Sequence, residues 1–249
     1  MMEWFGRSNK NYDFDMFSTS HFIVLAILII GSVCIFLFRD SLKKKNMRQT
    51  EIVLAISLII MEASYHFWMI INGSWNVSHS IPLELCSISL MLTIVLLLTR
   101  LKIIYEILLF TALLGASQAL LTPLLNYDFP HFRFFHFFYT HLMIIWVPLY
   151  FTWALGYRPT IWSVAKLFVF LNVLMPIIMF INKVVGGNYM FLSHKPDSSS
   201  LLDVLGPYPW YILSLEGLLI SLSLIVWFIF REKAKAVKQP EVSKNFTIH

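Results

Sequence analysis

Charged residues are scarce in this chain of 249 residues, since Asp, Glu, Lys and Arg together make up only 13% of it. A soluble domain of average composition carries about 25%. Hydrophobic residues make up 58% of the chain, so there is too little charge to cover a water-facing surface. The composition excludes an ordinary soluble domain and predicts a protein whose surface lies largely in lipid.

Several short motifs that carry chemistry are also missing. Two cysteines are too few for a disulfide scaffold. The sequence contains no Gly-rich phosphate loop, no CxxC and no HExxH, and we expect no cofactor. Glu62, His66 and His141 have side chains that bind metals, but their spacing matches no metal signature, so we expect no metal. The net charge of +5 does not indicate nucleic acid, because Lys and Arg lie in short loops beside apolar segments.

Seven apolar segments are each about long enough to cross a bilayer as a helix, which takes about 20 residues. Lipid cannot satisfy free backbone N–H and C=O groups, so each segment should be helical. The predicted fold is therefore all-α, a polytopic membrane protein with about seven transmembrane helices in one bundle. The segments are 19–38, 51–71, 83–99, 103–125, 135–155, 161–184 and 210–230. Proline removes a helical hydrogen bond, and we expect Pro123, Pro148 and Pro176 to kink three of them.

The positions of Lys and Arg predict the orientation of this bundle. Fourteen of the 19 Lys and Arg residues fall on one side of it, and basic loops stay in the cytoplasm. We therefore expect a multi-pass protein of the cell membrane with its N-terminus outside and its C-terminus in the cytoplasm. Residues 1–230 would form one transmembrane domain, with a lead-in at 1–18 and an outer cap loop at 186–209. Residues 231–249 would form a polar cytoplasmic tail.

Polar residues within the predicted spans gather at one depth, in the outer half of the bundle. Ionisable groups inside a membrane usually face a partner or a wet cavity. We therefore expect one shared cavity, while the alternative is a set of separate hydrogen bonds between helices. The stretch 130–148, PHFRFFHFFYTHLMIIWVP, enters it with three histidines. The expected cavity residues, besides Cys86 and His141, are Glu62, His66, Glu84, Gln118, Thr122, His136, Asn182 and Glu216.

Cys86 and a histidine at the same depth have the side chains of a nucleophile and its base. The thiolate is the nucleophile, and an imidazole can accept its proton. His136 and His141 are five residues apart, about 140° around a helix, so they cannot both face Cys86. We favour His141, which lies deeper. Cys34 lies at a different depth and should be inert, and a buried cysteine can also be a small apolar side chain.

Four stretches resemble the YwaF-like family of bacterial integral membrane proteins, which is related to transmembrane protein 164 of eukaryotes. They are SIPLELCSIS (80–89), ASQALLTP (116–123), FRFFHFFYTH (132–141) and GGNYMFLSHKP…SLLDVLGPYPWYILSLE (186–216). The resemblance covers nearly the whole chain and implies a multi-pass helical membrane protein. Many relatives have histidine two residues before the cysteine, where this chain has Glu84.

The resemblance also implies a chemistry. The eukaryotic branch is described as an acyltransferase that places polyunsaturated acyl chains on ether phospholipids with a Cys and a His, roles that fall on Cys86 and His141 here. Our first hypothesis is a lipid acyltransferase or related lipid-modifying enzyme, with membrane lipids as partners. The alternative is a transporter or receptor that binds a small polar solute in the same cavity without covalent chemistry.

Overall fold

The computed structural model describes residues 3–7, 12–196 and 201–232, and in these residues the chain is helical with no strand. Six helical stretches are long and apolar enough to cross a membrane, and the helix α4 is a shorter apolar one. The chain is therefore a multi-pass membrane protein. The stretches are α1 (Thr19–Leu37), α3 (Arg48–Ile71), Lys102–Leu121, α7 (Phe132–Trp153), α8 (Ile161–Val185) and α9 (Trp210–Phe230), with α4 at Leu85–Thr99.

The predicted polytopic bundle is confirmed, and the helix limits lie close to the predicted ones. The fourth predicted span is divided into α5 (Lys102–Thr111), a π-helical turn (Ala112–Ala116) and α6 (Ser117–Leu121). Pro123 follows the end of α6, so the prediction that it kinks this span was wrong: a helix usually ends before a proline. Pro148 and Pro176 do lie inside α7 and α8.

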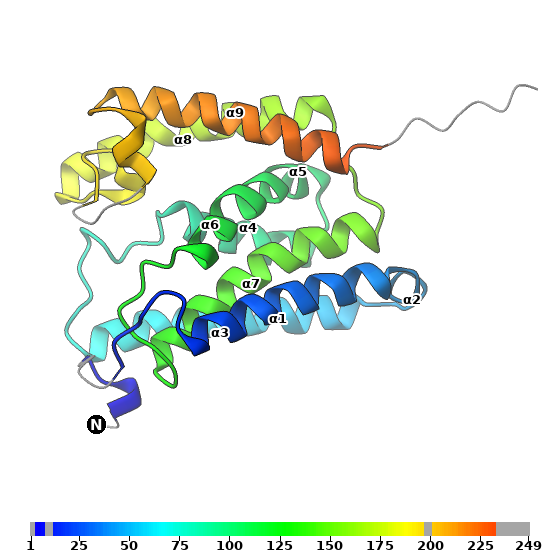
Figure 1. Cartoon of the computed structure of the whole chain (residues 1–249), viewed down its shortest axis with the longest axis horizontal. Helices are drawn as coiled ribbons and strands as arrows, with labels where there is room; N and C mark the ends of the chain where they lie inside the picture. The colour runs from blue at the N-terminus through cyan, green and yellow to red at the C-terminus, as the bar shows by residue number, and fades with distance from the viewer. Residues whose placement is uncertain (1–2, 8–11, 197–200, 233–249) are drawn as a thin grey trace, which may run out of the picture.

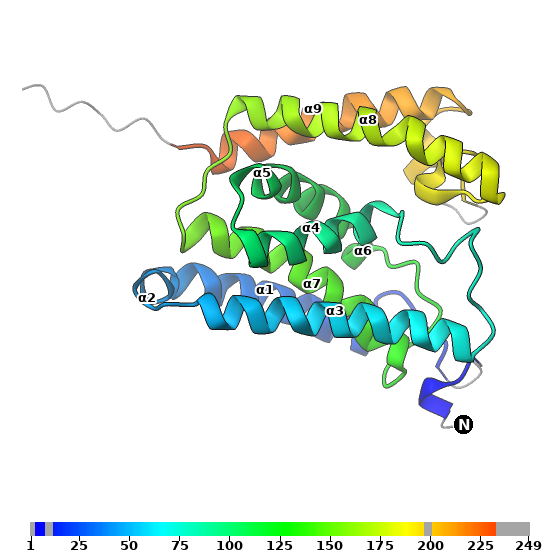
Figure 2. The same cartoon turned by 180° about the vertical axis from the view of Figure 1, so that it is seen from behind.

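The helices form layers with α7 in the interior (Figures 1 and 2). Helices α1 and α3 lie on one side of α7, the group α4 to α6 lies on the other, and α8 with α9 covers that group. In the most apolar window of α7, 78% of residues are buried, against 11% in α1 and 17% in α8 and α9. Apolar side chains on the outer helices are therefore left to contact lipid.

Two groups of connections mark the two ends of the bundle. Residues 12–18 and 186–196 lie at one end, and α2 (Arg39–Lys44) and the last turn of α9 lie at the other (Figure 1). We call these the outer and the inner end, after the predicted orientation. Ser18 caps α1 by accepting the N–H of His21, and Gly186 ends α8 with a φ of 64°, which glycine adopts without strain.

The segment after α8 packs back onto the helices. The Tyr189 side chain is buried, and its hydroxyl donates to the carbonyl of Val77 at 2.7 Å. The Asn182 side chain, on α8, accepts a hydrogen bond from the N–H of Tyr189 at 2.8 Å and donates one to its C=O at 3.0 Å. Short 3-10 turns occur at Glu3–Phe5, Tyr189–Phe191 and Leu201–Leu205. Of the predicted cytoplasmic tail, residues 233–249 lie outside the described residues.

Candidate functional site

Three of the expected cavity residues meet between α3 and α7. The carboxylate of Glu62 lies 3.1 Å from Nε2 of His136 and 3.6 Å from Nε2 of His66. Glu62 and His66 are one turn apart on α3, so both face α7. Polar contacts thus join these three residues, which also share a depth in the predicted spans.

Arg133 extends this cluster and was not among the predicted site residues. Its guanidinium donates to Nδ1 of His136 at 2.9 Å and lies 3.9 Å from the centre of the Tyr65 ring. Arginine has donors only, so Nδ1 of His136 accepts a hydrogen bond and its Nε2–H donates to Glu62. The i,i+3 spacing of Arg133 and His136 on one helix face was the signal that could have found this pair.

His141 lies on another side of α7. It is buried, and its Nδ1 lies 2.7 Å from the carbonyl oxygen of Phe137. A carbonyl can only accept, so the proton sits on Nδ1 and Nε2 keeps its lone pair. Among the described residues no hydrogen bond engages Nε2. His141 therefore has a basic nitrogen available, whereas both ring nitrogens of His136 are engaged.

Cys86 is half-buried in the first turn of α4. It shares a helix face with the buried residues Leu90 and Thr93. Its neighbour Leu85 packs against the π-helical turn, with Cδ2 3.5 Å from where a β-carbon on Gly115 would lie. Within the described part of the chain, Cys86 makes no hydrogen bond to His136 or His141. The other cysteine, Cys34, is exposed on α1.

The remaining expected cavity residues lie outside the Glu62 cluster in the described part of the chain. The carboxylate of Glu84 accepts the N–H of Met190 at 2.9 Å, and Asn182 is engaged by the backbone of Tyr189. The others are not joined to the Glu62 cluster by any hydrogen bond in the residues that the structure describes: Gln118 and Thr122 are exposed and bond to each other at 2.8 Å, and Glu216 is half-buried. The hydrogen bonds therefore form separate groups rather than one network.

Two other buried acids are paired near the inner end. Arg100 donates two hydrogen bonds of 2.7 Å to the carboxylate of Glu51. Glu106 accepts from Ser163 at 3.0 Å and also pairs with Lys166. Buried charges are costly unless paired and hydrogen-bonded, and these pairs join α3 to the α4–α5 connection and α5 to α8. Neither acid was among the expected cavity residues.

A buried histidine also joins α1 to α6. Nε2 of His21 donates to the carbonyl of Leu120 at 2.8 Å, and Nδ1 accepts the N–H of Phe17 at 3.0 Å. With both nitrogens engaged, His21 fixes the start of α1. In the described residues, no group of three or more His, Cys, Asp or Glu side chains is placed to hold a metal ion.

Comparisons with known proteins give one match. No curated protein and no solved structure is significantly similar to the chain. The model of the TMEM164 family matches residues 16–227, a range that runs from the residues before α1 almost to the end of α9. This agrees with the family resemblance of the sequence motifs, and the chain belongs to the TMEM164 family.

Proposed function

We propose that this protein is a lipid acyltransferase of the cell membrane, in which the Cys86 thiol is the nucleophile and His141 is the general base. The observation that carries the proposal is the hydrogen bond from His141 to Phe137, which leaves Nε2 free to accept a proton. Family membership supports the reaction class, because the family resemblance implies a Cys and a His at these positions.

The hydrogen bonds favour His141 over His136 as the base. Arg133 and Glu62 occupy both nitrogens of His136, so that imidazole has no lone pair to offer. His141 lies about 140° around α7 from His136. Since His136 faces α3 through Glu62, His141 lies on a side of α7 turned away from that contact.

The packing supports an approach of Cys86 to that side of α7. Helix α7 contacts both α4 and the π-helical turn, and the first turn of α4 packs on the same turn through Leu85 and Gly115. π-helical turns often occur at functional sites. Catalytic hydrogen bonds in substrate-free enzymes are often long and tighten when substrate binds, so the proposal requires Cys86 and His141 to meet in the substrate complex.

The proposed reaction has two halves. Nε2 of His141 takes the Cys86 proton, and the thiolate attacks the carbonyl carbon of a phospholipid acyl ester. The ester C–O bond breaks, the leaving oxygen takes the proton from His141, and a lysophospholipid departs from an acyl-Cys86 thioester. The hydroxyl of an acceptor lysophospholipid then gives its proton to His141 and attacks the thioester. The C–S bond breaks, and the thiolate recovers the proton.

The test is acyl transfer by purified protein in vesicles that contain a phospholipid with a labelled acyl chain and an unlabelled lysophospholipid. We expect label on the acceptor with the wild type and with Cys34→Ala, and none above background with Cys86→Ala or His141→Ala. Transfer by Cys86→Ala at the wild-type rate would overturn the proposal. So would a wild-type protein that folds but transfers no label from ether or ester phospholipids.

A second function is favoured by one other observation. Four ionisable side chains, Arg133, His136, Glu62 and His66, form a continuous chain between α3 and α7, and such groups in a membrane also serve solute binding and proton transfer. Under this alternative, a transporter or receptor binds a small polar solute without covalent chemistry. A lipid-soluble thiol probe would then react with Cys86 no faster than with Cys34.

A further inference from the structure

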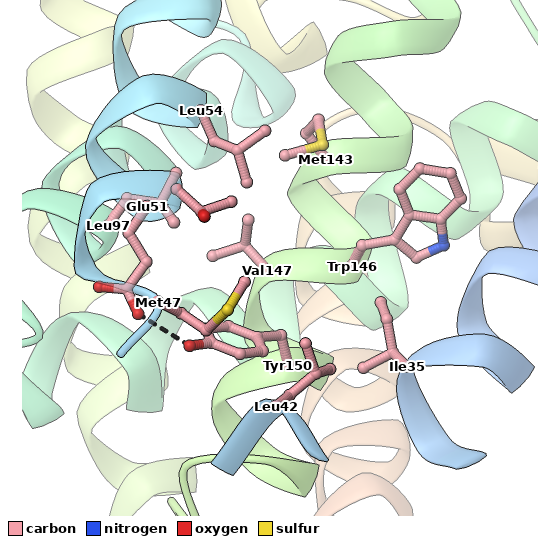
Figure 3. Close-up of a pocket in the computed structure, with 11 residues that line it drawn as sticks. Ile35, Leu42, Met47, Glu51, Leu54, Leu97, Met143, Trp146, Val147 and Tyr150 are labelled. Carbon is pink, nitrogen blue, oxygen red and sulfur yellow. Dashed lines mark hydrogen bonds between the residues drawn. The ribbon is translucent and has the colours of Figure 1, made fainter. Parts of the chain in front are cut away.

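A cavity of about 200 Å³ lies between α1, α3 and α7, away from the proposed catalytic residues (Figure 3). Its α7 wall is made of Met143, Trp146, Val147 and Tyr150, which follow the i, i+3, i+4, i+7 spacing of one helix face. His141 precedes Met143 by two residues, about 200° around the helix. The cavity and the free nitrogen of His141 are therefore on opposite sides of α7.

The only carboxylate in the cavity wall is already neutralised, as far as the described residues show. Tyr150 donates its hydroxyl to Glu51 at 2.9 Å, and Figure 3 draws this hydrogen bond as a dashed line. Arg100 holds the same carboxylate through two contacts of 2.7 Å, and Arg48 approaches it to 3.3 Å. Two arginines thus surround one acid, and the rest of the lining is almost entirely apolar. Such an interior suits hydrocarbon better than a polar solute.

A strongly basic stretch of the chain lies next to the residues that line the cavity. Leu42 of α2 lines the cavity, while the next three residues, Lys43, Lys44 and Lys45, are exposed. The ten residues from 39 to 48, RDSLKKKNMR, contain five basic side chains and one acid. Basic clusters directly beside a membrane helix attract anionic lipid head groups. The apolar interior therefore suits the acyl chain of an anionic phospholipid, and the neighbouring lysines suit its head group.

We propose that this cavity binds an acyl chain of an anionic phospholipid from the leaflet at the inner end, with the phosphate of its head group held by Lys43, Lys44 and Lys45. This is a second lipid site, separate from the proposed reaction at Cys86. It does not depend on that reaction, since no residue of the cavity is assigned a catalytic role. A zwitterionic lipid would fill the same apolar space but gain less from the lysines.

Trp146 provides a direct readout of occupancy, because it lines the cavity. Full-length protein is placed in vesicles in which a fraction of the lipid carries brominated acyl chains, which quench nearby tryptophan. The Trp146 signal is the difference in fluorescence between wild type and Trp146→Phe. We expect a brominated anionic lipid to quench this signal at a mole fraction about tenfold lower than brominated phosphatidylcholine, because several lysines act together near the head group.

Two variants separate the head-group contact from the chain. Lys43, Lys44 and Lys45 changed together to Gln should remove the preference for the anionic lipid. The matched control changes Lys233, Lys235 and Lys238, in the basic stretch after α9, to Gln and should keep the preference. Thr50→Phe, at the exposed edge of the cavity, should reduce quenching by both lipids.

Three results would overturn the proposal. They are equal quenching by anionic and zwitterionic lipids, equal effects of the two triple-lysine variants, or no quenching of Trp146 by either lipid. Glycerol phosphate added in water tests the head group without a chain. If it displaced the anionic lipid completely at millimolar concentration, the site would bind phosphate alone and the acyl-chain part would be wrong.

Discussion

His141 Nδ1 donates a hydrogen bond of 2.7 Å to the carbonyl oxygen of Phe137, one helical turn earlier on α7. This bond fixes the imidazole tautomer with its proton on Nδ1. Nε2 is therefore unprotonated, and its lone pair can accept a proton. His136, five residues earlier, has neither nitrogen free. The difference between the two histidines is the structural basis of the proposed catalytic role, and it leads to the first prediction.

The reactivity of Cys86 should depend on His141. Cys34 is exposed and Cys86 is half-buried, so access alone would favour Cys34. Activation by His141 should instead make Cys86 react faster with a lipid-soluble thiol probe. His141→Gln should slow labelling of Cys86 by about 100-fold, the lower range for loss of a general base, and leave Cys34 unchanged. Mass spectrometry of the two labelled peptides gives both rates in one sample, and faster labelling of Cys34 in wild type would contradict the account.

Glu84 should reduce the nucleophilicity of Cys86. Its carboxylate accepts the N–H of Met190 and lies two residues from the cysteine, where a negative charge opposes formation of a thiolate. Glu84→Gln keeps an oxygen that can accept from Met190 but removes the charge. We expect Cys86 to be labelled several-fold faster in this variant. Glu216→Gln removes a charge from α9 and is the control, and equal rates in the two variants would argue against the effect.

Gly31 should be intolerant of a larger side chain. A β-carbon there would lie 2.3 Å from Cζ2 and 2.6 Å from Cε2 of Trp146, far inside van der Waals contact. Gly31→Ala should therefore force α1 away from α7 and lower the free energy of unfolding by about 1–3 kcal/mol. Gly217→Ala is the matched control, because a β-carbon there would meet no packed atom within 4 Å and Ala favours helix by up to about 1 kcal/mol. Thermal unfolding in detergent compares the two, and a Gly31→Ala melting temperature at or above that of wild type would rule out the clash.

Attachment of residues 3–7 to the outer end should weaken in acid. Nε2 of His131 donates to the carbonyl of Gly6 at 2.9 Å, and burial lowers the pKa of His131 despite this hydrogen bond. The attached state therefore binds fewer protons than the detached state just below pH 6.5, the usual pKa of histidine. Its stability rises with pH through this window and is lost as the pH falls.

Hydrogen exchange of residues 3–7, corrected for intrinsic rates, measures this change. We expect less protection at pH 5.5 than at pH 7.5 in the wild type. His131 is the N-cap of α7 and accepts the N–H of Arg133. His131→Asn keeps a capping side chain but cannot titrate, so its corrected protection should not vary with pH. The same pH dependence in both proteins would show that another group titrates.

The helices could be predicted from the sequence because each depends on local information. The length of each apolar segment predicted each span. Ser18 lies directly before α1, as its N-cap, and Gly186 lies directly after α8. The division of the fourth span could not be predicted. Its π-helical turn packs against α4, where Leu85 lies beside Gly115, and such a contact with a neighbouring helix is not visible in local composition.

Local spacing also predicts part of the arrangement around Glu62. Helical spacing placed Glu62 and His66 on one face, and common depth placed them in one group with His136, but the contact of His136 with Glu62 comes from the structure. Depth alone could not show that Asn182 holds the backbone of Tyr189 or that Glu84 holds Met190. These contacts depend on how the segment after α8 folds back, and no periodicity in the sequence reports that.

The most direct measurement is the intact mass of the protein after incubation with a phospholipid donor and no acceptor. The account predicts one added acyl group that hydroxylamine removes, as expected for a thioester, located on Cys86 by peptide mapping. It should be present in Cys34→Ala and absent in Cys86→Ala. An acyl group on Cys34 or on a hydroxyl side chain, or no adduct in protein that transfers acyl chains, would contradict the proposed role of Cys86.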